Sequence, residues 1–149
     1  MARAVAADWT EYTLRTLERE GYRSSAPRAA VVDALAELGC GATAKQIAGR
    51  VSQHGQRVGL ASVYRALEVL DRLRLVQRLD TGEGAARYEP ALPSGEHHHH
   101  LVCDTCGTVS TFEDADLERA IQRLSRRVEF AIDAHDVTLR GECPTCHRR

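Results

Sequence analysis

The sequence predicts an α+β protein: an N-terminal winged helix-turn-helix domain followed by a small α/β domain rich in candidate metal ligands. Three observations lead to this prediction. Four helical patterns and a hairpin pattern precede residue 90, a stretch with two prolines and a glycine follows, and two Cys-x-x-Cys pairs lie beyond it. A chain of 149 residues is long enough for two small domains. We place the first domain at 1–90, a hinge at 91–96 and the second domain at 97–149.

The composition is that of a folded protein, with 43% hydrophobic and 28% charged residues. These values exclude a disordered or collagen-like chain. Residues 1–90 carry a net charge of +2 and residues 91–149 a net charge of −3, which suggests domains with different partners. The chain lacks a signal-peptide pattern and the ~18 apolar residues of a membrane span. We therefore expect a cytoplasmic protein without a membrane partner, in which the five cysteines do not form a disulfide framework.

The first three helices are predicted from apolar periodicity and from signals at their ends. Ser25 is suited to cap the second helix, with Pro27 in its first turn. Thr43 and Gln46 form a capping box at the start of the third. The predicted segments are 9–20, 26–38 and a third helix that begins at Thr43. Their expected inward side chains are Trp9, Leu14, Leu17, Val31, Leu35, Leu38, Ile47 and Val51.

A fourth helix, 60–74, is predicted to be followed by a β-hairpin. Its apolar stripe consists of Leu60, Val63, Leu67 and Leu70. Two short extended runs, 75–79 and 86–89, are then joined by the turn sequence Asp-Thr-Gly-Glu-Gly. Helices closed by a hairpin make a winged helix-turn-helix, a fold whose last helix before the wing enters the major groove of double-stranded DNA.

The residues near the start of the fourth helix are the candidates for reading DNA bases. Arg65 is able to contact a guanine in bidentate fashion, Tyr64 to meet a thymine methyl group or a phosphate, and Ser62 lies on the same turn. Arg23 and Arg28 are candidates for phosphate contacts. The alternative is a plain solvated surface, because all but one of the basic residues are arginine and the net charge of +2 is weak support.

Four cysteines of the second half form two knuckles, Cys103-Asp-Thr-Cys106 and Cys143-Pro-Thr-Cys146. Thiolates at this spacing in a tight turn both reach one ion, and two such turns complete the tetrahedron that zinc prefers. A redox Cys-x-x-Cys is the alternative, but such motifs occur singly at a strand-to-helix junction. We therefore predict a structural zinc site that contributes to the folding of the domain.

Four consecutive histidines stand before the first knuckle. An expression tag would lie at a terminus, whereas this run is internal and continuous with a strand pattern. In an extended chain alternate side chains point to opposite faces, so His97 pairs with His99 and His98 pairs with His100. The run therefore predicts two distinct metal sites.

The remainder of the second half offers further ligands. Residues 114–127 are predicted as an amphipathic helix with Leu117, Ile121 and Leu124 inward, and Glu118 lies beside that stripe. Residues 130–139 alternate as a strand whose phase shifts at His135, which favours a bulge there. A lone histidine is usually structural and a lone helical glutamate is usually a surface charge, so neither residue alone predicts a site.

The chain resembles the ferric uptake regulator (Fur) family over nearly its whole length. The resemblance rests on Gly-Leu-Ala-Ser-Val-Tyr-Arg-Ala-Leu at 59–67, on the run from His97 to Cys103, on Cys-x-x-Cys-Gly at 103–107 and on the closing cysteine pair. It implies a homodimeric, metal-dependent transcriptional repressor of metal-homeostasis genes that binds a palindromic operator. It also implies that the C-terminal domain is the dimerisation domain and that a regulatory metal lies near the hinge.

The resemblance also implies ligand sets. For the regulatory divalent metal, iron or zinc, these are Glu89, His98 and His100, and for an additional site they are His97, His99, Glu118 and His135. The chain departs from the family pattern at Gly41, where many members have a histidine; the neighbouring Cys40 is a candidate substitute. It also has Thr111 where some peroxide and iron sensors have an acidic ligand, and Gln77 where zinc sensors often have an aspartate.

Three alternatives to this metal-responsive repressor, whose ion is iron or zinc, stay open at this point. Zinc-specific or peroxide-sensing members of the same family fit the pattern as well. A zinc hydrolase would need an open metal site beside a general base, and the chain lacks a His-Glu-x-x-His motif, so we expect neither an enzyme nor a small-molecule substrate. A metal buffer or zinc-ribbon module without DNA binding would leave the first half without a role.

Overall fold

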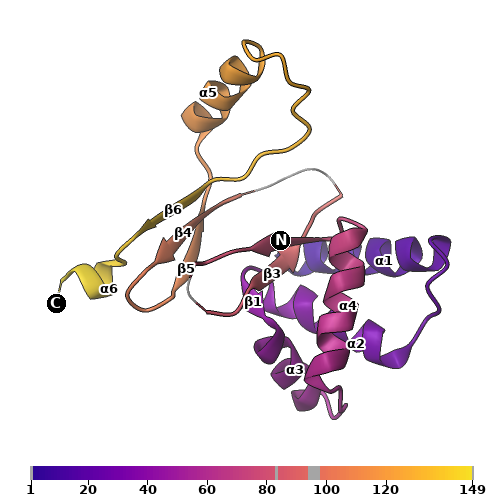
Figure 1. The fold of residues 1–149 in the computed structure, drawn as a ribbon. Coiled ribbons are helices and arrows are strands. Elements are labelled where there is room, and N and C mark those ends of the chain that lie inside the picture. Colours follow the sequence, from indigo (N-terminus) through magenta and orange to yellow (C-terminus); the bar gives the residue numbers. More distant parts are fainter. Residues whose placement is uncertain (1, 83, 94–97, 149) are drawn as a thin grey trace. The chain divides into compact units, whose positions relative to one another are not determined.

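The computed structural model describes residues 2–82, 84–93 and 98–148, with side chains from residue 8 onward (Figure 1). The chain forms two compact units, Met1–Glu96 and His97–Arg149, and each is described by itself. Part of the predicted hinge, residues 94–96, and His97 lie outside the described residues. In the part of the chain that is described, no helix is both long and apolar enough to cross a membrane.

Four helices build the first unit: α1 (Ala2–Arg19), α2 (Ala26–Leu38), α3 (Ala44–Gln53) and α4 (Leu60–Arg72). The predicted caps are confirmed, because the Ser25 hydroxyl accepts the Arg28 N–H and the Thr43–Gln46 capping box is present. Helix α1 begins earlier than the predicted 9–20. Its first turns are rich in alanine, which favours helix without producing the apolar periodicity on which the prediction rested.

A small antiparallel sheet closes the first unit. The predicted hairpin is confirmed as β2 (Val76–Leu79) paired with β3 (Arg87–Pro90). A two-residue strand, β1 (Ala42–Thr43), pairs with the other edge of β3, so the order is β1-β3-β2. Strand β1 was not predicted, because two residues are too few to show the period of a strand.

The core of the first unit lies where the helices meet. Trp9, Leu35 and Leu70 are fully buried in it, and the Trp9 Nε1–H donates to the Leu75 carbonyl oxygen at 2.9 Å. This bond fastens α1 to the connection between α4 and β2. The predicted stripe of α4 was wrong at Leu60, whose exposed fraction is 46%, because the first turn of α4 extends past the core. Ala66 joins Val63, Leu67 and Leu70 on the buried face instead.

The second unit is a three-stranded sheet with two helices: β4 (His99–Cys103), β5 (Val109–Phe112), α5 (Ala115–Ser125), β6 (Thr138–Gly141) and α6 (Pro144–His147). Its strand order is β5-β4-β6, with β5 antiparallel and β6 parallel to the central β4. The predicted strand 130–139 was wrong over most of its length, because residues 131–137 have no regular secondary structure and pairing begins at Thr138. Among the described residues, the strand that pairs with this part of the chain is β4, which it reaches only from Val137 onward.

The buried side chains of the second unit are few. Among the residues described in this unit they are His99, His100, Val102 and Cys103, and all four belong to β4. The predicted inward face of α5 was wrong, since that helix buries no residue and Leu124 has an exposed fraction of 49%. Figure 1 shows α5 projecting away from the sheet of its own unit. The apolar stripe that its periodicity predicts is present, but a single chain provides nothing to cover it.

Candidate metal centres

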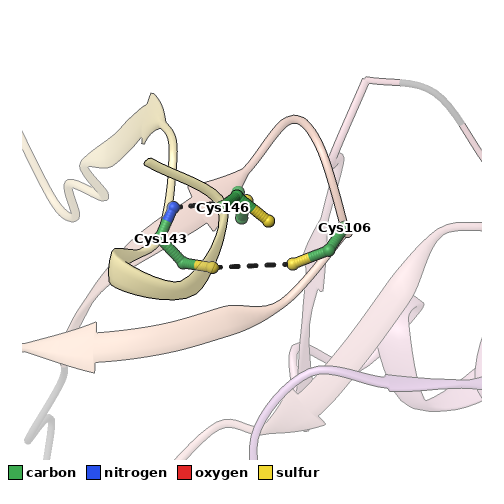
Figure 2. Close-up of side chains that lie close together, drawn as sticks. Cys106, Cys143 and Cys146 are labelled. Atoms are coloured by element: carbon green, nitrogen blue, oxygen red, sulfur yellow. Dashed lines mark hydrogen bonds between the residues drawn. The ribbon is translucent and has the colours of Figure 1, made fainter. Parts of the chain in front are cut away.

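The four cysteines of the second unit come together as one cluster. Figure 2 shows three of them, Cys106, Cys143 and Cys146. The four sulfur atoms all lie within 4.8 Å of one another. The Cys106 and Cys143 sulfurs are 3.7 Å apart. In a tetrahedral site with zinc–sulfur bonds of about 2.3 Å, two sulfurs are separated by about 3.8 Å. The cluster therefore has the spacing that a zinc ion requires.

Backbone geometry explains how this cluster forms. Cys103 ends β4, and the turn after it is closed by the Gly107 N–H, which donates to the Cys103 carbonyl at 2.8 Å. Gly107 has a φ of 72°, a left-handed conformation that glycine adopts without strain. Cys143 caps α6, and its own N–H donates to the Cys103 sulfur at 3.3 Å. One knuckle thus follows a strand, the other begins a helix, and a direct bond joins them.

Electrostatics show that the cluster suits a cation. Backbone N–H groups, that of Cys143 first, lower the pKa of Cys103 to about 6. Hydrogen bonding to Cys143 together with burial raises the pKa of Cys146 to about 12. Crowded sulfurs cannot all ionise by themselves, whereas a divalent cation stabilises four thiolates at once. Sulfur donors in a tetrahedral arrangement fit structural zinc, which would supply a closed site that holds β4 and α6 together.

A second group in the same unit combines two imidazoles with one carboxylate. His99 Nε2 lies 2.7 Å from Glu118 Oε1, and His135 Nε2 lies 3.1 Å from Glu118 Oε2. Their candidate ligand atoms all lie within 4.8 Å of one another. These residues come from β4, α5 and the connection before β6, and His99 is buried. A carboxylate between two histidines is a donor set that zinc, iron and manganese accept; His97, the predicted fourth ligand, lies outside the described residues.

The predicted regulatory ligands fall into two pairs, one in each unit. In the first unit, the Cys40 thiol donates to Glu89 Oε2 at 2.8 Å, and Glu89 has an exposed fraction of 3%. Burial, and then the Glu89 carboxylate, raise the pKa of Cys40 to about 12, so this thiol is not a reactive nucleophile at neutral pH. In the second unit, the His98 and His100 rings lie 5.1 Å apart between centroids, with their planes at 66°.

The position of Cys40 depends on a contact that sequence reasoning missed. The Arg87 guanidinium donates to the Gly41 carbonyl at 2.9 Å. Together with the pairing of Ala42 with Tyr88, this bond holds the turn after α2 against β3. In the sequence, Arg87 stands only two residues before Glu89, which indicates that it lies near that ligand. This spacing does not reveal that Arg87 contacts the turn after α2.

The residues predicted to read DNA lie at the start of α4. Tyr64 and Arg65 are exposed and Ser62 is half-buried, on the side opposite the buried Val63 and Leu67. Arg23 is exposed as well. Arg28 has a structural role, since its guanidinium donates to the Arg23 carbonyl at 2.8 Å and lies over the Tyr22 ring.

Comparison with known proteins adds to this geometry. The family model described as the ferric uptake regulator family matches residues 19–140. The chain is 38% identical to a ferric uptake regulation protein of Bacillus subtilis over 98 residues, which covers 65% of this chain and 66% of that protein. It is 29% identical to the Bordetella parapertussis protein of the same name over 133 residues, with 89% and 94% covered.

Solved structures agree in fold. The Helicobacter pylori ferric uptake regulator, described as having three functional metal binding sites, superposes with a TM-score of 0.80 at 25% identity over 95% of this chain and 93% of that one. The Vibrio cholerae regulator gives a TM-score of 0.76 at 27% identity, with 87% and 98% covered. Members of this family bind DNA as dimers and are not enzymes, which excludes the hydrolase alternative. With a helical DNA-binding part and a sheet domain that carries four clustered cysteines, the chain belongs to the ferric uptake regulator family of metal-responsive transcriptional regulators.

Proposed function

We propose that this regulator is a cytoplasmic repressor of metal-homeostasis genes that binds a palindromic operator as a metal-loaded homodimer. The observation that carries the proposal is the pair of half-sites: Cys40 with Glu89 in the first unit, and His98 with His100 in the second. They stand on either side of the proposed hinge, 91–96, in the sequence. One divalent ion, iron or zinc, that binds Glu89, His98, His100 and Cys40 would join the two units.

The proposed mechanism is thermodynamic linkage. An ion that binds the DNA-competent arrangement more tightly than the open one shifts the population toward the former by that difference in affinity. Joining the units in both subunits would set the spacing of the two α4 helices, and half-site spacing on DNA depends on that distance. In this proposal Ser62, Tyr64 and Arg65 read bases, while Arg23 and Arg28 contact phosphates.

The exposed apolar side chains of the second unit support a homodimer. Phe130 has an exposed fraction of 79%, unusually high for so apolar a side chain. Residues 131–137 also lie outside regular secondary structure. A second copy would cover the exposed apolar groups. The apolar residues concerned are Leu101, Leu124, Val128, Phe130, Ile132 and Leu139.

The other two centres have separate proposed roles. The four cysteines hold structural zinc, as their spacing and pKa values suggest. His99, Glu118 and His135, with His97, form an additional site that is independent of the four-cysteine cluster. This site contains no sulfur ligand, so it accepts harder ions than the cysteine cluster does.

Alanine in place of both His98 and His100 is expected to weaken metal-activated DNA binding by about tenfold or more, because the ion loses its ligands from one unit. A DNA site is first selected from a random-sequence pool with the zinc-loaded protein. Its affinity is then measured by gel shift against free metal concentration. The matched control is His54→Ala. His54 is a partly exposed histidine that caps the C-terminus of α3 and pairs with Glu37, outside the proposed metal sites. Wild-type binding that is indifferent to metal, or unchanged in the double variant, would overturn the proposal.

A further inference from the structure

Cys40 stands apart from the other cysteines of the chain. The remaining four belong to the zinc cluster, whereas Cys40 follows Gly39, the C-terminal cap of α2. The residue is exposed overall, while its sulfur is partly desolvated where it contacts Glu89, so an ion approaches the sulfur from the open side. Its Sγ lies against Glu89 Oε2, a buried carboxylate of β3. The pair thus joins a soft donor that is open to solvent with a hard donor that is fixed in the sheet.

The backbone around this pair is held in place from both sides. β1 pairs with β3 directly beside it, with Ala42 opposite Tyr88 and Thr43 opposite Arg87. The Arg87 guanidinium bonds to the Gly41 carbonyl. The thiol and the carboxylate are therefore brought together by the fold rather than by a chance side-chain rotamer, which is a requirement for a selective site.

The two atoms are hydrogen-bonded and lie closer together than two ligands of one ion would, so ion binding requires them to move apart. Sulfur and oxygen bound tetrahedrally to zinc, at about 2.3 and 2.1 Å, lie about 3.6 Å apart. The observed 2.8 Å is a hydrogen bond with a proton between the atoms. A small side-chain rotation opens the pair for an ion, which takes the place of that proton, and the proton passes to solvent.

We infer that Cys40 is a ligand of the regulatory ion and that its thiolate makes this regulator respond to zinc in preference to iron(II) or manganese(II). Thiolate ligands favour zinc, whereas manganese and ferrous ions bind sites of oxygen and nitrogen donors with less discrimination. Gly41, next in the sequence, has no side chain that offers an imidazole instead. The inference rests on the proposed function, because it names the ion of that same site.

Cobalt(II) is the spectroscopic test, because a cobalt–thiolate bond gives an intense near-ultraviolet charge-transfer band that nitrogen and oxygen ligands do not give. The full-length dimer is prepared under reducing, anaerobic conditions with its four-cysteine cluster filled by zinc, and is titrated with cobalt(II). We expect the band to appear at one equivalent per chain and to be absent in Cys40→Ser. The site with Glu118 contributes no such band, since it contains no sulfur. A band that is missing in the wild type, or that persists in Cys40→Ser, overturns the inference.

Selectivity is measured by competition with chelators for zinc and for manganese. Cys40→Ser is expected to weaken zinc binding by about a hundredfold and manganese binding by less than about threefold, because only zinc depends strongly on sulfur. Cys40→His should restore metal binding while it lowers the preference for zinc. Equal losses for both ions would contradict the inference. Fluorescence of the buried Trp9 reports whether the first unit of each variant is folded.

The two proposals fail in distinguishable ways. If Glu89→Gln and His98→Ala abolish metal-activated DNA binding while Cys40→Ser leaves the zinc preference intact, the regulatory site stands and the role of Cys40 is wrong. If none of these variants changes metal-activated binding, the proposed site itself is wrong.

Discussion

Cys143→Ser is expected to release zinc from the second unit and to unfold that unit while the first stays folded. Structural zinc in small domains contributes about 10 kcal/mol or more of apparent binding free energy, which is folding free energy where no other core exists. Here the buried apolar side chains among the described residues of the unit are Val102 and Cys103, too few to stabilise about 50 residues. Hydrogen exchange resolved by segment measures the loss, together with zinc content per chain.

Cys40→Ser is the matched control for that variant. It makes the same chemical change outside the cluster, so the zinc held by the four cysteines and the protection of β4 should stay at wild-type values, while zinc at the proposed regulatory site is weakened. Trp9, with its bond to the Leu75 carbonyl, reports the first unit independently. If Cys143→Ser kept both its zinc and the slow exchange of β4, the cluster would not be the support of this unit.

Phe130→Asp is expected to weaken dimer formation by about a hundredfold or more. A central aromatic side chain at an interface commonly accounts for about 2 kcal/mol or more, and a carboxylate in its place adds the cost of desolvation. Analytical ultracentrifugation over a range of protein concentrations measures the change. DNA affinity should fall with it, since two linked α4 helices are needed for a palindrome.

The control for this variant is the same substitution at an exposed aromatic residue of the other unit. Tyr12 on α1 has an exposed fraction of 41%, so Tyr12→Asp replaces an exposed aromatic ring by the same charge without touching the proposed interface. It should leave the dimer intact. If Phe130→Asp forms dimers with unchanged affinity, the exposed apolar face around Phe130 is not the dimer interface, and the subunits contact each other elsewhere.

Much of the first unit was predictable because its signals are local. A helix is defined by its own caps and stripe, as at Ser25 and Thr43, and a hairpin by the turn between its strands. The exceptions depend on distant partners. β1 exists only because β3 lies beside it, and Leu60 is exposed because the buried face of α4 begins one turn later, at Val63.

The second unit shows where a single sequence stops being sufficient. Alternation predicted a strand from Phe130, but pairing begins only at Thr138, because a strand also needs a neighbour that the sequence pattern cannot supply. The same applies to the stripe of α5, whose apolar side chains are correctly spaced but are only half-buried at Leu117 and Ile121 and exposed at Leu124. The cysteine cluster was predictable because two Cys-x-x-Cys turns supply the four thiolates of one tetrahedral zinc site, and few chain arrangements satisfy that geometry.

The register of β4 against β5 and β6 determines which of the two proposed histidine sites each imidazole enters. His99 and His100 are adjacent, and a shift of one residue along β5 and β6 would exchange the faces on which they emerge. Cys103, at the other end of the same strand, belongs to the four-cysteine cluster, which therefore fixes the register of β4. Loss of the proposed zinc ion from this cluster would therefore destabilise the unit and also release the register of β4. His99 and His100 would then no longer be assigned each to its own proposed metal site.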